Sequence, residues 1–186
     1  MFMYFVCQTE KCTLPKLRFC IFTLIHEMTP KIELINAKKI IGIKHKMSLT
    51  QFTVSELWKR FMPRRKEIKY CNSNNLISLA IYDSGYFDRF SPDALFERWA
   101  AVEVHEFDSI PEGMEPFVIP AGLYAVFHYK GDQSDTTIFQ YIYESWLPSS
   151  EYVIDERPHF EILSNTYKNN DPQSEEEIWI PIKLKQ

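Results

Sequence analysis

The sequence predicts an α+β domain made of two similar β-α-β-β units, related by a pseudo-two-fold axis, with a cleft where the two units meet. The first observation is an internal repeat, because residues 37–63 match residues 122–148 without a gap: Ile41 falls on Val126 and Pro63 on Pro148. The second is that each copy reads as strand, polar turn and helix, followed by two further apolar strand candidates. Strands that alternate this little with helices favour an antiparallel sheet over a doubly wound parallel one.

The opening strands and the helices follow from residue type and spacing. Ile40–Lys44 and Tyr124–Tyr129 are rich in branched and aromatic side chains, which suit strands. Apolar side chains then recur at three- and four-residue spacing, as in an amphipathic helix: Val54, Leu57, Trp58 and Phe61 in the first copy, and Ile138, Tyr141, Ile142 and Trp146 in the second. Pro63 and Pro148 are expected to end the two helices.

Two strand candidates follow each helix. They are Leu76–Tyr82 and Trp99–Glu106 in the first unit, and His159–Ser164 and Glu177–Lys183 in the second. The expected domain spans residues 28–186, with halves at about 29–110 and 111–186.

Residues 1–27 differ from the rest of the chain. Their two apolar runs, Met1–Cys7 and Phe19–Ile25, are each too short to span a bilayer, and no cleavage site of a secretory signal is evident. We expect a peripheral extension, the alternative being an added strand or helix that packs on the domain. A cytoplasmic location without membrane contact is expected.

Composition argues against several classes of protein. The 186 residues carry a net charge of −4, whereas a domain that grips phosphate backbones usually has a basic patch. The basic run Lys59–Lys69 is better explained as the solvated face and end of a helix, so no direct DNA binding is expected. None of the four cysteines forms a CxxC pair, and we expect reduced thiols, no metal and no cofactor.

A candidate ligand site comes from strand alternation, which puts residues two apart on one face. In "HFEIL", Glu161 lies opposite to the apolar Phe160 and Ile162; in "EEEIWIPI", Trp179 lies opposite to three isoleucines. If the last two strands form a hairpin, Glu161 and Trp179 could share a face with Trp99 and Tyr82. Aromatic rings around a carboxylate suit a flat cationic ligand. The alternatives are a surface glutamate paired with Lys or Arg, and tryptophans that only pack the sheet.

Three segments resemble the GyrI-like effector-binding domain family: "IPAGLYAVFHYKG", "YESWLPSSEYVIDERPHFEIL" and "EEEIWIPI". This domain is also the ligand-binding module of AraC-type and MerR-type regulators, and it occurs alone in integron-associated proteins. The resemblance implies the duplicated fold and a pocket that binds lipophilic cations through an acidic residue among aromatics. It matches that acid to Glu161, with rings expected from Trp99, Tyr82, Tyr143 and Trp179. One departure is Ala101, where the family usually has glycine.

The resulting hypothesis is a stand-alone domain for multidrug or effector binding, without the helix-turn-helix for which 27 residues are too few. The first alternative is a hydrolase of cyclopropane-containing compounds, which the resemblance also implies, with Glu161 as general base and Tyr143 or Tyr82 assisting the leaving group. The second is a gyrase-interacting or transcription co-regulatory protein with an unknown partner. No GxSxG, HExxH or GxGxxG motif points to another enzyme class.

Overall fold

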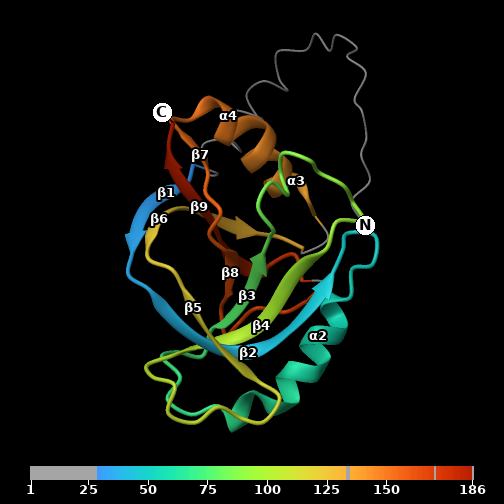
Figure 1. Ribbon diagram of the computed structural model, residues 1–186, viewed down its shortest axis with the longest axis vertical. Helices are drawn as coiled ribbons and strands as arrows, with labels where there is room; N and C mark the ends of the chain where they lie inside the picture. The colour runs from blue at the N-terminus through green and yellow to red at the C-terminus, as the bar shows by residue number, and fades with distance from the viewer. Residues whose placement is uncertain (1–28, 133–134, 170, 186) are drawn as a thin grey trace.

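In the computed structural model of the protein, an antiparallel sheet of nine strands carries two helical segments (Figure 1). The structure describes residues 29–132, 135–169 and 171–185. The elements in chain order are β1 (Lys31–Ile35), β2 (Lys38–Met47), α2 (Val54–Phe61), the 3₁₀ segment η1 (Met62–Glu67), β3 (Leu76–Ile81), β4 (Phe96–Val104), β5 (Glu115–Ile119), β6 (Gly122–Lys130), α3 (Thr137–Gln140), the π-helical segment η2 (Tyr141–Trp146), α4 (Leu147–Ser149), β7 (Tyr152–Ile154), β8 (His159–Leu163) and β9 (Glu175–Leu184).

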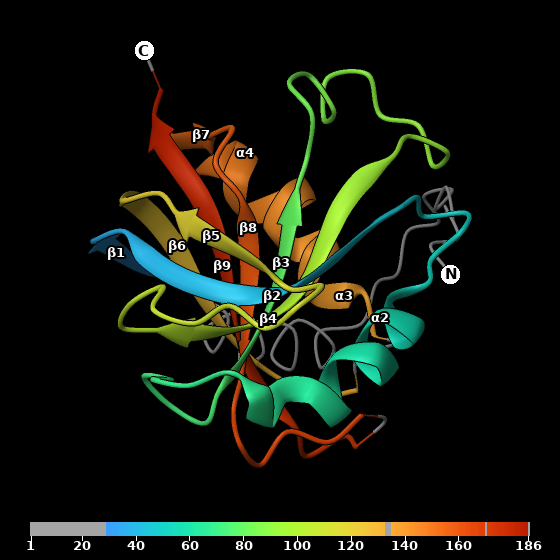
Figure 2. The same cartoon turned by 60° about the horizontal axis from the view of Figure 1, so that its bottom comes forward.

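The strand order confirms the duplicated architecture. The order is β1-β6-β9-β8-β3-β4-β2-β5, and β7 pairs with β9 outside this path. The two central strands, β3 and β8, run antiparallel and side by side (Figure 2). Reading outward from them, β4, β2 and β5 in one half correspond to β9, β6 and β1 in the other. The α+β fold and its pseudo-two-fold relation therefore agree with the sequence-based expectation, whereas residues 1–28 and the extension predicted there lie outside the described residues.

The two helical segments differ in their details. Helix α2 ends at Phe61, and the chain continues through Pro63 as the 3₁₀ segment η1, since a proline near the start of a turn gives up no intrahelical hydrogen bond. In the second half the helix passes through a π-helical turn before Pro148 opens the last turn, α4. The basic run lies on α2 and η1, where Arg64 pairs with Glu67 at 2.6 Å in an exposed position.

Each face of the sheet has its own core. On one face, α2 packs against the first half around Leu57, Phe61 and Val102, and η2 packs against the second half around Ile142 and Ile178. We call this the helix face. On the opposite face, one cluster joins both halves. The sheet is strongly curved (Figure 2). Phe117 of the edge strand β5 packs on Trp99 of this cluster, with 5.4 Å between ring centroids.

The alanine that departs from the family pattern is accommodated across the sheet. Ala101 of β4 is fully buried and stands opposite Gly42 of β2. A Cβ atom on Gly42 would lie 2.2 Å from the carbonyl oxygen of Ala100 and 2.6 Å from Cβ of Ala101. The side chain at Ala101 therefore fits because its partner strand has glycine at this position.

Three further features concern a thiol, metal ligands and membrane-spanning helices. Cys71, the cysteine within the described residues, is a free, half-buried thiol. Within the same part of the chain, no group of three or more His, Cys, Asp or Glu side chains is placed to hold a metal ion, and no helix is long and apolar enough to cross a membrane.

Candidate functional site

The carboxylate of Glu161 lies at the junction of the two halves, on the helix face. Strand β8 sets Glu161 directly opposite Ser78 of β3 on one side and Ile178 of β9 on the other. Because directly opposed residues of antiparallel strands share a face, Glu161 projects into the space between α2 and η2. Its side chain is 17% exposed. A carboxylate this poorly hydrated needs a charged or hydrogen-bonding partner.

That partner is Arg98 of β4. Its Nη2 donates to the two carboxylate oxygens of Glu161 at 2.7 and 2.8 Å, and to Oγ of Ser78 at 2.6 Å. Burial opposes the charged guanidinium, but the adjacent Glu161 carboxylate holds the pKa of Arg98 above its ordinary value. Nε of Arg98 is buried without a hydrogen-bond partner. The site therefore contains an ion pair in which the arginine is engaged through one nitrogen.

Four rings form a layer beside this ion pair: Tyr82, Phe87, Tyr143 and His159. Phe87 stacks on His159 at 5.3 Å and on Tyr143 at 5.8 Å, and Tyr82 meets His159 edge-on at 5.1 Å. We refer to these residues as the ring layer. The π-helical turn of η2 carries Tyr143, and such turns often occur at functional sites.

The polar groups of the ring layer are neutral near pH 7. Burial, with a smaller contribution from Arg98, lowers the pKa of His159 to about 3. Burial raises the pKa of Tyr82 to about 12 and raises the pKa of Tyr143 well above its ordinary value. The Tyr143 hydroxyl lies 3.1 Å from Nδ1 of His159, so these two groups satisfy each other by a hydrogen bond. The layer thus presents uncharged, largely apolar ring surface next to a charged pair.

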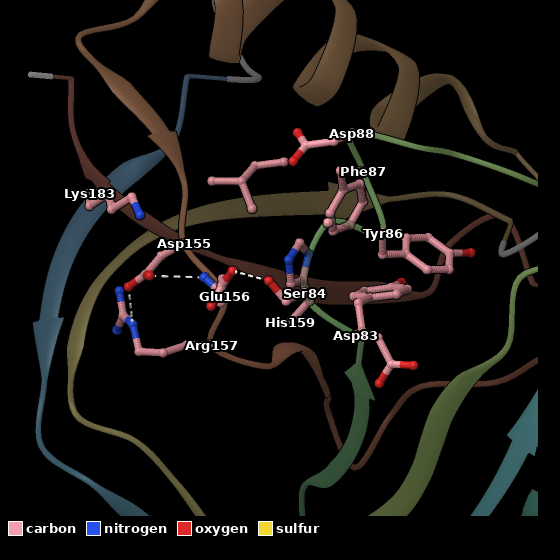
Figure 3. A pocket seen from close by; sticks show the side chains of 13 residues that line it. Asp83, Ser84, Tyr86, Phe87, Asp88, Asp155, Glu156, Arg157, His159 and Lys183 are labelled. Atoms are coloured by element: carbon pink, nitrogen blue, oxygen red, sulfur yellow. Dashed lines mark hydrogen bonds and ion pairs between the residues drawn. The ribbon is translucent and has the colours of Figure 1, made fainter.

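A cavity of about 210 Å³ opens at one end of the junction (Figure 3). The first half contributes the loop 82–88 and the second half contributes residues 154–157. Hydrogen bonds close its polar rim, from Ser84 to Glu156 at 2.6 Å and from Arg157 to Asp155 at 2.6 Å (Figure 3). Glu161 does not line this cavity. Tyr82 and His159 do, and both are neighbours of Glu161 on the helix face, so the ring layer separates the cavity from the carboxylate.

The structure brings together three of the five site residues expected from the sequence: Glu161, Tyr82 and Tyr143. It contradicts the expected shared face for Trp179, because Trp179 pairs with Phe160 and stacks on it at 5.2 Å, on the opposite side of the sheet from Glu161. Trp99 lies on that opposite side too, in the same buried cluster. Alternation within a strand shows which of its residues share a face. Only the register between strands shows which face of one strand lies beside which face of the next.

Arg98 and His159 were missed as parts of the site. Arg98 precedes Ala100, Val102 and Val104 at two-residue spacing, on the side of the strand that looked purely apolar. A single charged residue at the start of such an apolar series is the signal that could have identified it. The alternative of a glutamate paired with a basic residue was therefore correct about the pair, although the pair is mostly shielded from solvent rather than on the surface.

A second hollow lies on the face away from the helices. Its volume is about 350 Å³, and it is lined by Glu33, Glu103 and Trp179 together with the turn between β1 and β2. Lys38 already pairs with Glu103 at 3.1 Å. Trp179 thus borders two carboxylates, but on the face of the sheet opposite to Glu161.

Comparison with known proteins shows the family of this chain. Residues 28–183 match the GyrI-like small molecule binding domain. The protein belongs to the GyrI-like family. Its resemblance to that family is thereby confirmed over nearly all of the described residues.

Three known proteins are similar to this chain. The transcriptional regulator BrlR of Pseudomonas aeruginosa PAO1 is 31% identical over 160 residues, which are 85% of this chain and 57% of the regulator. The structure of SAV2435 bound to tetraphenylphosphonium has a TM-score of 0.65 at 16% identity and covers 84% of this chain and 94% of that one. An integron cassette protein from the mobile metagenome of Vibrio cholerae has a TM-score of 0.59 at 15% identity, covering 83% and 96%. The two structural likenesses show the fold, and the chain spans a little over half the length of BrlR.

Proposed function

We propose that this GyrI-like domain binds lipophilic aromatic cations at the junction of its halves, with Glu161 as the counter-charge. The observation that supports this most is the poorly exposed Glu161 carboxylate beside the ring layer. The family is a small-molecule binding one, and a relative of the same fold is described with tetraphenylphosphonium bound.

The carboxylate keeps the capacity to face a ligand while Arg98 is present. An ionised carboxylate has about four acceptor positions, and Arg98 reaches it through the single nitrogen Nη2. A delocalised organic cation is weakly hydrated, so it loses less than an ammonium ion on entering such a site. Contact of the cation with the face of a ring contributes about 0.5–2 kcal/mol, and Tyr82, Phe87 and Tyr143 supply such rings.

Binding requires the ring layer to move. The cavity of about 210 Å³ is below the range of roughly 300–1,000 Å³ that is typical of ligand pockets. Phe87 lies on the loop that follows β3 and is 38% exposed, so among the rings of the layer it is the one least held by its surroundings. Displacing Phe87 from His159 and Tyr143 would enlarge the cavity and expose the rings that lie next to Glu161.

The same geometry favours capture over hydrolysis. A general base works best with a free carboxylate, and Arg98 occupies both oxygens of Glu161. The raised pKa of Tyr82 and of Tyr143 makes both hydroxyls weak proton donors for a leaving group. Hydrolysis of a cyclopropane-containing compound thus needs a rearranged site, whereas binding needs only the displaced ring.

Calorimetric titration with tetraphenylphosphonium tests the proposal. We expect wild-type protein to bind and Glu161→Gln to lose at least tenfold in affinity, because the amide keeps the shape of the side chain without its charge. Glu103→Gln is the matched control, since Glu103 lies by the second hollow on the opposite face. An unchanged affinity in Glu161→Gln combined with a loss in Glu103→Gln would move the site to that hollow, and no binding by wild type would refute the proposal.

A further inference from the structure

A second carboxyl group, that of Glu176, lies next to Glu161 on the helix face. Strand β9 pairs Glu161 with Ile178 and Leu163 with Glu176, so Glu176 stands two residues from the partner of Glu161 on the neighbouring strand. Such diagonal neighbours share a face, with Cα atoms about 7–8 Å apart, within reach of two long side chains. Both carboxyl groups therefore border the same space at the junction of the halves.

The two acids differ in whether a positively charged side chain pairs with them. Arg98 is hydrogen-bonded to Glu161 and Ser78, and together Arg98 and Glu161 carry no net charge. No hydrogen bond or ion pair from another described residue engages the carboxyl group of Glu176. Tyr129 lies directly across from it on β6, and Tyr167, in the loop before β9, is also close enough for its pKa to respond to the charge of Glu176. Glu176 is thus the group whose ionisation sets the net charge of the site.

The surroundings hold a proton on Glu176 in the free protein. Burial, and then the nearby Glu161 carboxylate, raise the pKa of Glu176 to about 8, while Arg98 acts in the opposite direction. Tyr129 and Tyr167 stay neutral, because burial raises the pKa of Tyr129 to about 12 and that of Tyr167 further. The free site therefore has no net charge near pH 7, and an incoming cation would add a positive charge to a poorly hydrated space.

We propose that Glu176 is the second acidic group of the cation site, and that binding of a cation expels its proton to the solvent. This inference rests on the proposed function. The protonated carboxyl and the free cation become a carboxylate facing the bound cation plus one released proton, so charge is conserved within the site. Glu161 would face the bound cation as proposed above, and Glu176, once its proton has left, would offset the positive charge that the cation adds. The ring layer would discriminate for shape.

Proton release is measured by titrating wild-type protein with tetraphenylphosphonium at pH 7.5 in phosphate and in Tris, which differ in ionisation enthalpy. A group titrating near pH 8 is about three-quarters protonated at pH 7.5, so roughly 0.7–0.8 proton should be released per ligand bound. The affinity should rise by several-fold, and at most about tenfold, per pH unit between pH 6.5 and 7.5. Glu176→Gln should release no proton and bind with an affinity independent of pH.

Glu177→Gln is the matched control, because Glu177 is adjacent in the chain but faces the other side of the sheet, where it accepts a hydrogen bond from Trp179. This variant should keep the wild-type proton count. The proton count of wild type needs no substitution, so the test holds even if Glu176→Gln folds poorly. Binding without proton release would overturn the inference and leave the proposed function intact, whereas absence of binding by wild type would remove both.

Discussion

Replacing Arg98 by methionine should lower stability while tightening the binding of cations. The side chains of Arg98 and Glu161 are 12% and 17% exposed, so their ion pair is largely, though not fully, shielded from solvent. Removing one partner of a buried pair costs about 3–5 kcal/mol, because it leaves the other charge uncompensated. Since water still reaches part of the Glu161 carboxylate, we expect the lower end, about 3 kcal/mol of unfolding free energy. For a chain of this size that corresponds to a fall of about 6–12 °C in the melting temperature.

A double-mutant cycle separates the two effects. Arg98→Met with Glu161→Gln leaves no lone charge, so it should recover the stability to within about 1 kcal/mol of wild type. In the single variant, Glu161 has lost its internal cation, and tetraphenylphosphonium should bind about tenfold more tightly at pH 8, a gain of about 1.4 kcal/mol. Urea unfolding and calorimetric titration measure the two quantities. Unchanged stability in Arg98→Met together with weaker binding would refute the account of this ion pair.

Three further predictions concern the rings. His159 binds a proton only near pH 3 when folded and near pH 6.5 when unfolded, so the unfolded chain binds more protons between these values. The unfolding free energy of wild type relative to His159→Gln should therefore fall by about 2 kcal/mol from pH 8 to pH 5, measured by urea titration. Phe87→Ala should speed association of tetraphenylphosphonium several-fold in stopped flow; a slower rate would show that Phe87 does not block the entry. Trp179→Phe should cost about 1–2 kcal/mol of stability and leave the affinity within twofold, because its ring packs on Phe160 across the sheet; a larger loss of affinity would return Trp179 to the site.

The fold could be predicted because its signals are local and repeated. Six of the nine strands and both helical segments were visible in apolar spacing, and the repeat doubled the evidence for the first strand and the helix of each half. The strands β1, β5 and β7 were not predicted. Spacing also could not show the change from α-helix to a π-helical turn at Tyr141–Trp146, because the same apolar pattern fits an α-helix.

The site was only partly predictable because it depends on register. Glu161 and Tyr82 follow from alternation within single strands joined at the centre, where β3 and β8 pair. Trp179 was placed on the wrong face because a shift of one residue in register exchanges the faces of a whole strand. Arg98 reaches Glu161 across an intervening strand, and no spacing within one segment shows a contact of that kind.

The central claim is that the site selects for positive charge, and the most direct measurement compares two ligands of the same shape. Tetraphenylphosphonium and tetraphenylborate are nearly equal in size and opposite in charge. Calorimetric titration of wild-type protein should show the cation bound at least a hundredfold more tightly than the anion, with most of that difference lost in Glu161→Gln. Equal affinity of wild type for the two ions, or the same preference for the cation in Glu161→Gln, would contradict the claim.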